Sequence, residues 1–531
     1  MASQTKPEFG KLRSFFWPVH RSECRIFVPL LLIYFLITFN YSMLRAAKDS
    51  LVITAKSSGA EAIPFIKVWA ILPAAILITY LFTRLSNKYK IEHVFYLMMS
   101  LFLGFFLLFA FVLYPMQDYL HPNAFADHLE QILPHGFKGF IAIFRNWTFT
   151  LFYVMSELWG TAIMTVLFWG FVNEITSIEA AKRFYVLLTL GANLSAIVSG
   201  EMAGLISHWG TSIRFIHSID PWGNSLILLA SLVFLSGICA VAIFRWLNRN
   251  GLKTFLSDSS FQFNHGPSEI KMGLRKNFSY LAKSKYLTCI AIIVVTYNIA
   301  INLTEVVWKD QLHQICPDPN DYQAYMGKVL TWVGVMSTII GLSAGAILRR
   351  FNWTITAMIP PFILLATGIG FFSFLIFKDT GLSLLSAALG STPLAIGVFF
   401  GSMQNCLSRA SKYTLFDATK ELSFIPLSKE CKLKGKAAID GVGSRIGKSG
   451  GAVVYQFLLM SLGTVGASTP YVGVILLFVV GGWMFAVRSL GKQFTSIMTT
   501  KGTVDIPEKV PEPLAAAGVL PKSEPKQEVS S

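Results

Sequence analysis

Six ionisable residues lie within apolar stretches of the sequence that are long enough to cross a membrane. A charged side chain at the centre of such a helix costs about 2.5–3.5 kcal/mol, so these residues are expected to face a cavity or one another. Ammonium and guanidinium groups pair with phosphate oxygens, which makes the cations candidate ligands of a polyanion. The carboxylates could hold the cations in an empty site or accept a proton. The six residues are Lys67, Glu157, Glu201, Glu305, Arg445 and Lys448.

Other polar residues in the apolar stretches have two possible interpretations. Tyr297, Asn298 and Asn302 follow one face of a predicted helix, and Gln404 and Asn405 lie together in another. Such side chains could contact a nucleobase or form hydrogen bonds between helices. The six charged residues could likewise be ion pairs that hold helices together.

Further charged or glycine-rich motifs have simpler interpretations. Arg145 lies at one predicted helix end, and the adjacent residues Lys48 and Asp49 lie at another. Long basic side chains at such positions usually extend to the membrane surface. Gly-Lys-Ser at 447–449 is no phosphate-binding loop, because Val442 stands where that motif needs its first glycine. The six cysteines and nine histidines show no paired spacing, so we expect no metal site and no cofactor.

The composition identifies the elements that must position these residues. Charged residues make up 14% of the 531-residue chain and apolar residues 53%, whereas soluble proteins average about 25% charged residues. A membrane-crossing helix needs about 20 mostly apolar residues, and twelve segments meet this requirement. We therefore expect an all-α membrane protein. The twelve segments are 26–44, 62–83, 94–116, 141–173, 184–206, 222–245, 286–306, 326–348, 353–377, 382–408, 437–465 and 468–488.

The distribution of basic residues predicts the orientation. Loops after even-numbered spans, such as 84–90 and 412–436, are rich in Lys and Arg, whereas the loop at 117–136 is poor in them. Because cytoplasmic loops retain basic residues, both termini are predicted to be cytoplasmic. Two causes then explain the net charge of +16: basic residues are retained in cytoplasmic loops, and the translocation path carries anions. We therefore expect no nucleic-acid partner.

A long hydrophilic connection divides the chain into halves. It lies between the sixth and seventh predicted spans. Two six-helix bundles joined by a cytoplasmic linker are the plan of major-facilitator-type transporters, which bind substrate between the halves. The predicted parts are a cytoplasmic N-terminus (1–25), a first bundle (26–245), a basic linker (246–285), a second bundle (286–490) and a cytoplasmic, largely disordered tail (491–531).

Long strings along nearly the whole chain resemble one transporter family. They include FNYSMLRAAKDSLVITA (39–55), FYVMSELWG (152–160), INLTEVVWK (301–309) and KGKAAIDGVGSRIGKSGGA (434–452). These strings are similar to those of the nucleotide transporters, or ATP/ADP translocases, of plastids and obligate intracellular bacteria. The resemblance implies twelve helices in a major-facilitator-like plan. It also implies functional roles for four of the six charged residues: Lys67, Glu157, Glu305 and Lys448.

The resemblance leaves two coupling modes open. Some members of the family exchange ATP for ADP plus phosphate, and others import several nucleotides with protons. Ala46 and Ala47 replace the Asp-Thr expected of exchangers, and Glu201 replaces an expected arginine, as in the proton-coupled importers. A buried Glu201 would have to bind a proton to become neutral. The strings AKRFY (181–185) and SKYTLF (411–416) instead resemble exchangers.

The expected function is import of nucleoside triphosphates by alternating access, with proton symport favoured and ATP/ADP exchange as the alternative. Lys67, Lys448 and Arg445 are the expected phosphate ligands. The expected substrates are ATP and ADP, with GTP, CTP and UTP as further candidates and protons or phosphate as co- or counter-substrates. A membrane enzyme would need a metal-binding carboxylate cluster, which the sequence does not show. We expect a monomer in a bacterial inner membrane.

Overall fold

The computed structural model describes residues 17–176, 178–212, 220–251, 284–377, 386–436, 438–439 and 443–500. All the regular elements in these ranges are helices, and ten of them are long and apolar enough to cross a membrane. The chain is therefore a multi-pass, all-helical membrane protein. Most of the predicted linker and residues 501–531 of the predicted tail lie outside the described residues. Residues 491–500 of the predicted tail are helical, because the last long helix continues to Thr500.

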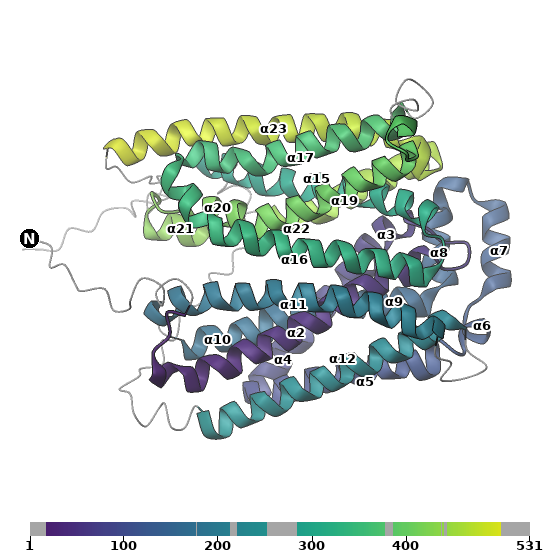
Figure 1. Cartoon of the computed structure of the whole chain (residues 1–531), viewed down its shortest axis with the longest axis horizontal. Coiled ribbons are helices and arrows are strands. Elements are labelled where there is room, and N and C mark those ends of the chain that lie inside the picture. Colours follow the sequence, from purple (N-terminus) through teal and green to yellow (C-terminus); the bar gives the residue numbers. More distant parts are fainter. Residues whose placement is uncertain are drawn as a thin grey trace, which may run out of the picture.

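The helices of the first half lie together on one side of the molecule (Figure 1). They include four short elements, two of them amphipathic, between the third and fourth long apolar helices. The elements are α2 (Arg21–Ile53), α3 (Ala62–Phe65), η1 (Ile66–Ile71), α4 (Leu72–Lys88), α5 (Ile91–Leu108), η2 (Phe109–Leu113), α6 (Gln117–Leu120), α7 (Asn123–Ile132), η3 (His135–Phe137), α8 (Lys138–Arg145), α9 (Trp147–Trp159), η4 (Gly160–Phe168), α10 (Trp169–Ile175), α11 (Ile178–Ser212), α12 (Pro221–Trp246) and η5 (Leu247–Gly251).

The helices of the second half form the other side of the molecule (Figure 1). The elements are α15 (Lys285–Ile315), α16 (Pro319–Arg350), α17 (Trp353–Ile376), α19 (Pro393–Ser411), η6 (Lys412–Phe416), α20 (Asp417–Ser423), α21 (Lys429–Lys436), α22 (Ser444–Leu462) and α23 (Val465–Thr500).

Local sequence signals explain where several helices begin. A side chain that accepts a hydrogen bond from a backbone N–H of the first turn precedes three of the long helices, and a proline occupies their first position. These pairs are Asp220 and Pro221 before α12, Asp318 and Pro319 before α16, and Thr392 and Pro393 before α19.

The helices differ in extent from the apolar segments that predicted them. The predicted span 141–173 is interrupted at Asn146, where α8 ends and α9 begins. Helix α2 continues to Ile53 and α15 to Ile315, about nine residues beyond the predicted spans. Hydrophobicity marks only the part of a helix that lies in hydrocarbon, whereas backbone hydrogen bonding carries the helix further.

Three helices that line the interior contain π-helical turns. These turns are η1 after α3, η4 after α9 and η6 after α19. A π-helical turn is rare and occurs mostly as a single turn within an α-helix, frequently at a functional site. The three turns carry residues of the site described below.

Helices α11 and α16 form the most extensive contact between the two halves (Figure 1). Glycines allow their backbones to approach closely. A Cβ atom on Gly200 would clash with the Thr331 hydroxyl and lie 2.5 Å from the carbonyl oxygen of Gly327, and a Cβ on Gly334 would lie 2.6 Å from the carbonyl oxygen of Asn193. Small residues let membrane helices pack at short range, and this interface depends on them.

Gly200→Ala is expected to destabilise the protein by about 1–3 kcal/mol, because the added methyl group cannot fit against α16 without moving it. Gly204→Ala on the same helix is the matched control, since its Cβ would meet no atom within 4 Å. Thermal unfolding of the two purified variants in detergent measures the difference. Equal stabilities would show that α11 and α16 separate easily at this point.

Candidate functional site

A cavity of about 380 Å³ lies between the two halves of the molecule. The first half contributes residues from α2, η1, α4, α9 and η4, and the second half contributes residues from α15, α19, η6 and α22. A ligand in this cavity therefore contacts both halves at once.

Positive charge dominates the wall of this cavity. Among the described residues that line it, seven side chains are cationic and two are carboxylates. The cations are Arg45, Lys48, Lys67, Arg409, Lys412, Arg445 and Lys448, and the carboxylates are Glu157 and Glu305.

The cavity runs from a buried end to an open one. At the buried end the Lys48 side chain is only 2% exposed and its Nζ lies 3.7 Å from the centre of the Tyr153 ring. At the other end Arg445 and Lys448, in the first turns of α22, are exposed. An anion can therefore reach these two cations first and the buried ones afterwards.

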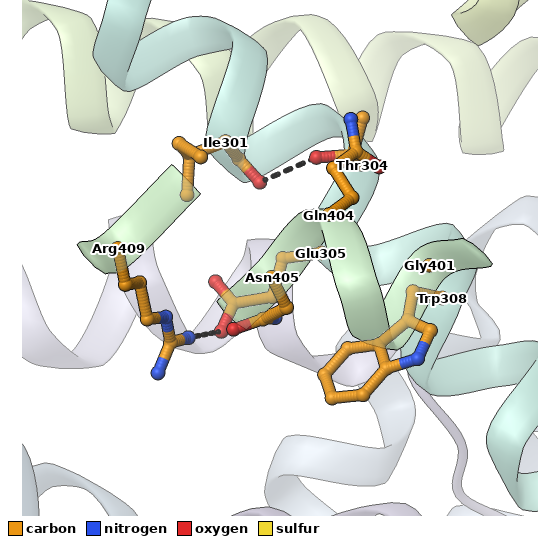
Figure 2. Close-up of a pocket in the computed structure, with 8 residues that line it drawn as sticks. All are labelled: Ile301, Thr304, Glu305, Trp308, Gly401, Gln404, Asn405 and Arg409. Atoms are coloured by element: carbon orange, nitrogen blue, oxygen red, sulfur yellow. Dashed lines mark hydrogen bonds and ion pairs between the residues drawn. The ribbon is translucent and has the colours of Figure 1, made fainter. Parts of the chain in front are cut away.

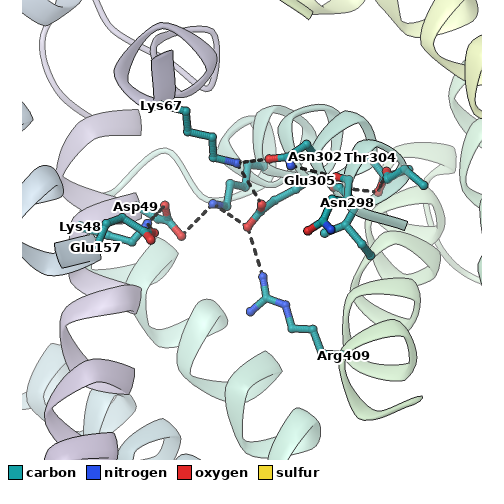
Figure 3. Close-up of polar contacts among 12 residues, drawn as sticks. Lys48, Asp49, Lys67, Glu157, Asn298, Asn302, Thr304, Glu305 and Arg409 are labelled. Carbon is teal, nitrogen blue, oxygen red and sulfur yellow. Dashed lines mark hydrogen bonds and ion pairs between the residues drawn. The ribbon is translucent and has the colours of Figure 1, made fainter. Parts of the chain in front are cut away.

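Glu305 is the centre of an ion-pair network at the buried end (Figure 3). Its carboxylate lies 3.4 Å from Lys67 Nζ, 3.1 Å from Lys309 Nζ and 3.1 Å from Arg409 Nη2. Lys67 also donates a 2.5 Å hydrogen bond to Asn302 Oδ1. Since Lys67 comes from the first half and the other residues come from the second, the two contacts of Lys67 cross the boundary between the halves.

A second crossing continues the network into α2. Lys309 Nζ lies 2.8 Å from Asp49 Oδ2, and both side chains are 1% exposed. Lys48 Nζ in turn lies 3.2 Å from Asp49 Oδ1 and 2.9 Å from Glu157 Oε1. The network therefore links Glu157 to Glu305 through alternating charges.

Further hydrogen bonds join the halves at the same end of the molecule. The Ser50 hydroxyl donates to the carbonyl oxygen of Pro319 at 2.6 Å, and the Gln456 amide donates to that of Pro64 at 2.8 Å. We call this end, where α3 and α6 to α8 lie (Figure 1), the closed end. The exposed cations Arg445 and Lys448 take no part in these contacts, and the cavity is open on their side.

The cavity wall also has an apolar region beside the cations. Ile71, Leu72 and Ile76 line it from the first half. From the second half Tyr297 lines it, and its ring packs against Phe416 at 4.8 Å between ring centres. A ligand with a planar apolar part and several negative charges matches both regions.

Comparison with known proteins identifies the family. The description of the matching family is "TLC ATP/ADP transporter", and the match covers residues 2–494. The chain belongs to the TLC ATP/ADP transporter family. It is therefore a transporter and not an enzyme, as the sequence predicted.

Two relatives and one solved structure illustrate the similarity of this TLC family member to known proteins. "ADP,ATP carrier protein 1" of Chlamydia pneumoniae is 46% identical over 495 residues, which are 93% of this chain and 95% of the relative. "ADP,ATP carrier protein 1, chloroplastic" of Arabidopsis thaliana is 43% identical over 470 residues, which are 88% of this chain and 74% of the relative. The D-xylose-proton symporter structure superposes with a TM-score of 0.51 at 12% identity over 88% of this chain and 96% of the symporter, which supports the major-facilitator-like fold alone.

Most of the predicted site residues of this TLC family member line the cavity. The second half of the chain contributes Tyr297, Asn298 and Asn302 to the wall, although the amides of Asn298 and Asn302 also donate hydrogen bonds within α15. All of the predicted charged residues line it except one: the lining set is Lys67, Glu157, Glu305, Arg445 and Lys448.

Gln404 and Asn405 do not line this cavity; they line a small separate pocket, to which Arg409 also contributes (Figure 2). Gln404 donates a 3.4 Å hydrogen bond to the carbonyl oxygen of Leu364. Asn405 Oδ1 is buried and has no hydrogen-bond partner in the described part of the chain. The structure therefore does not bring these two amides to the expected base-binding position.

Glu201 does not lie in the cavity. Its side chain is exposed at the contact between α11 and α16, where it accepts a 2.9 Å hydrogen bond from the Thr331 hydroxyl. The expectation that Glu201 is buried is therefore wrong. A carboxylate in the middle of an apolar sequence can lie at a helix contact, because only the tertiary structure determines which face of the helix is covered.

The sequence analysis missed several members of the ion-pair network. Lys48 and Asp49 are buried in α2, so the prediction that they extend to the membrane surface is wrong. Lys309 and Arg409 lie just beyond the predicted spans 286–306 and 382–408, so a search for charges within apolar stretches does not single them out. The signal that could have found them is the continuation of the helical pattern past the apolar stretch.

Arg145 is also buried rather than extended to the membrane surface. Its guanidinium lies 2.6 Å from Asp127 and 3.1 Å from Glu130, both on α7. The amphipathic helix α7 therefore supplies the acidic partners that the sequence reading did not pair with Arg145.

Proposed function

We propose that this TLC family member exchanges ATP and ADP across its membrane by alternating access. The observation that carries the proposal is the cavity between the halves, with its seven cations and two carboxylates. The names of the relatives, which are ADP,ATP carriers, support nucleotides as the polyanions that fit.

The residues of the cavity divide into three roles. Lys67, Lys448 and Arg445 bind the phosphates, since ammonium and guanidinium groups form short charge-assisted hydrogen bonds with phosphate oxygens. Glu157 and Glu305 hold the buried cations while no phosphate is bound. The base packs beside Tyr297, and Asn298 and Asn302 are candidates for contacts to its polar edge.

The excess of cations supports exchange over proton symport as the coupling mode. An empty cavity with surplus positive charge is costly to close, because charges taken out of water lose their solvation. A bound nucleotide compensates these charges, so the halves reorient with nucleotide bound in each direction. Proton symport, the mode favoured by the sequence, requires in addition a group that binds a proton during each cycle.

We propose that the protein has twelve membrane-spanning helices, two more than the ten that are long and apolar enough by themselves. Helix α19 packs against α15, α16 and α17, and helix α22 packs against α15. We assign these two helices as the remaining spans of two six-helix bundles. The parts are those expected from the sequence: 1–25, 26–245, 246–285, 286–490 and 491–531. We place both termini on the cytoplasmic side of a bacterial inner membrane and assign the carrier as a monomer.

Uptake of labelled nucleotide into lipid vesicles containing the purified carrier tests the function. Labelled ATP, GTP, CTP and UTP are supplied outside, with or without ADP inside and with or without a protonophore. We expect internal ADP to stimulate ATP uptake and the protonophore to have little effect. Uptake that needs no internal nucleotide and is abolished by the protonophore would instead establish proton symport.

Glu201→Gln is expected to leave ATP/ADP exchange within about twofold of wild type, because Glu201 is exposed and glutamine can still accept the Thr331 hydrogen bond. Initial rates of exchange in vesicles with and without a proton gradient measure this. Loss of a gradient-dependent component in the variant alone would identify Glu201 as a proton-coupling residue.

A further inference from the structure

The charges of the cavity discriminate between ionic forms of a nucleotide. We propose that the carrier takes ATP and ADP in their metal-free form and rejects the Mg²⁺ complexes. This inference rests on the proposed function and adds the form of the substrate. It follows from the pairing of the carboxylates, the position of the unpaired cations and the total charge of the wall.

The two carboxylates of the wall are already paired with cations. Glu157 lies 2.9 Å from Lys48, and Glu305 contacts three cations within 3.4 Å. Nucleotide sites that use Mg²⁺ usually bind it through one or two carboxylates together with the phosphates. In this cavity a Mg²⁺ ion near either carboxylate would approach Lys48, Lys67 or Arg409 and be repelled.

Three cations of the wall have no carboxylate partner within the described ranges of the chain. They are Arg45 on α2 and Arg445 and Lys448 on α22. Arg45 is half-buried, so its charge is not freely solvated. Because these cations come from both halves, closing the cavity around a ligand brings them together, and the ligand must supply the compensating negative charge.

The total charge of the wall favours the more negative ligand. Seven cations and two carboxylates leave an excess of five positive charges. A metal-free nucleoside triphosphate carries about four negative charges near neutral pH, and Mg²⁺ cancels two of them. The free nucleotide therefore leaves about one positive charge uncompensated and the complex about three, a difference that matters most where water is excluded.

The metal also competes for the phosphate oxygens themselves. In nucleotide complexes Mg²⁺ bridges oxygens of the β- and γ-phosphates and keeps several water ligands. Arg445 and Lys448 need oxygens of the same kind for short charge-assisted hydrogen bonds. A hydrated metal ion on the phosphates would hold these side chains away from them.

The test uses the full-length carrier in vesicles loaded with ADP and EDTA. Initial uptake of labelled ATP below saturation is measured at constant total ATP and ionic strength while Mg²⁺ is raised. We expect the rate to follow uncomplexed ATP, so that a tenfold fall in free ATP lowers uptake about tenfold. The chromium(III) complex of ATP, whose metal does not dissociate, is expected to compete at least about tenfold more weakly than ATP.

The outcomes separate this inference from the proposed function. ATP uptake that is independent of Mg²⁺, or equal competition by the chromium complex, would overturn the inference while leaving nucleotide exchange intact. Absence of ATP uptake with and without Mg²⁺ would overturn both.

A substitution in the wall tests the cause. Arg45→Glu removes a cation and adds an unpaired carboxylate, whereas Arg45→Gln only removes the cation. We expect the ratio of uptake with excess Mg²⁺ to uptake with EDTA to rise about tenfold in Arg45→Glu relative to Arg45→Gln. An equal ratio in the two variants would overturn the proposal. If Arg45→Glu does not fold, the Mg²⁺ titration of the wild-type carrier still decides the outcome.

Discussion

Lys309→Met is expected to lower the stability of the carrier by about 3 kcal/mol, because it leaves a buried carboxylate without its closest cation. Lys309 Nζ is 2.8 Å from Asp49 and 3.1 Å from Glu305, and the side chain is almost completely buried. Thermal unfolding in detergent measures the loss. Since the Asp49 pair joins the two halves at the closed end, exchange in vesicles should fall as well.

Two further variants make this prediction specific. Lys138→Met removes a cation that is half exposed and 3.2 Å from Glu61, so it should cost at most about 1 kcal/mol. The double variant Asp49→Asn with Lys309→Gln replaces a buried ion pair by neutral groups and should recover most of the stability. If Lys309→Met were no less stable than Lys138→Met, the buried pair would contribute little to the closed end.

Lys448→Ala is expected to raise the apparent KM for ATP about 10- to 100-fold, which corresponds to the loss of one charge-assisted hydrogen bond. Lys448 is exposed at the open end of the cavity and has no carboxylate partner among the residues that the structure describes, so its removal should leave the unfolding temperature unchanged. Initial rates of ATP/ADP exchange at increasing ATP measure the change.

One control for this variant keeps the positive charge at position 448, and the other removes a cation outside the cavity. Lys448→Arg keeps a cation in place and should recover most of the affinity for ATP. Lys492→Ala removes an exposed cation of α23 that does not line the cavity between the halves, and its KM should equal that of wild type. A wild-type KM in Lys448→Ala would exclude the phosphate-binding role.

The sequence predicted the helical class and several residues of the site because both follow from the properties of a membrane. Apolar segments must form helices to satisfy their backbone groups, and a charge inside such a segment needs a reason to be there. The residues Lys67, Glu157, Glu305 and Lys448 are recognisable on this basis, and all four line the cavity.

The ion-pair network could not be predicted in the same way. Its pairs join residues far apart in the sequence, such as Asp49 and Lys309, and no spacing along the chain records which charge meets which. Lys309 and Arg409 also lie just beyond apolar stretches. The environment of Glu201 likewise depends on how α11 packs against α16.

The π-helical turns have a consequence for how the cavity can change shape. Lys67 lies in η1, Thr161 in η4, and Lys412 with Tyr413 in η6, so three such turns carry side chains of the cavity wall. A π-helical turn holds one residue more than an α-helical turn, and each residue of an α-helix accounts for about 100° of rotation. If a turn passed from π to α geometry, the register of its hydrogen bonds would shift and the following part of the helix would twist. The wall could thereby present a different set of side chains to the cavity without unfolding any helix.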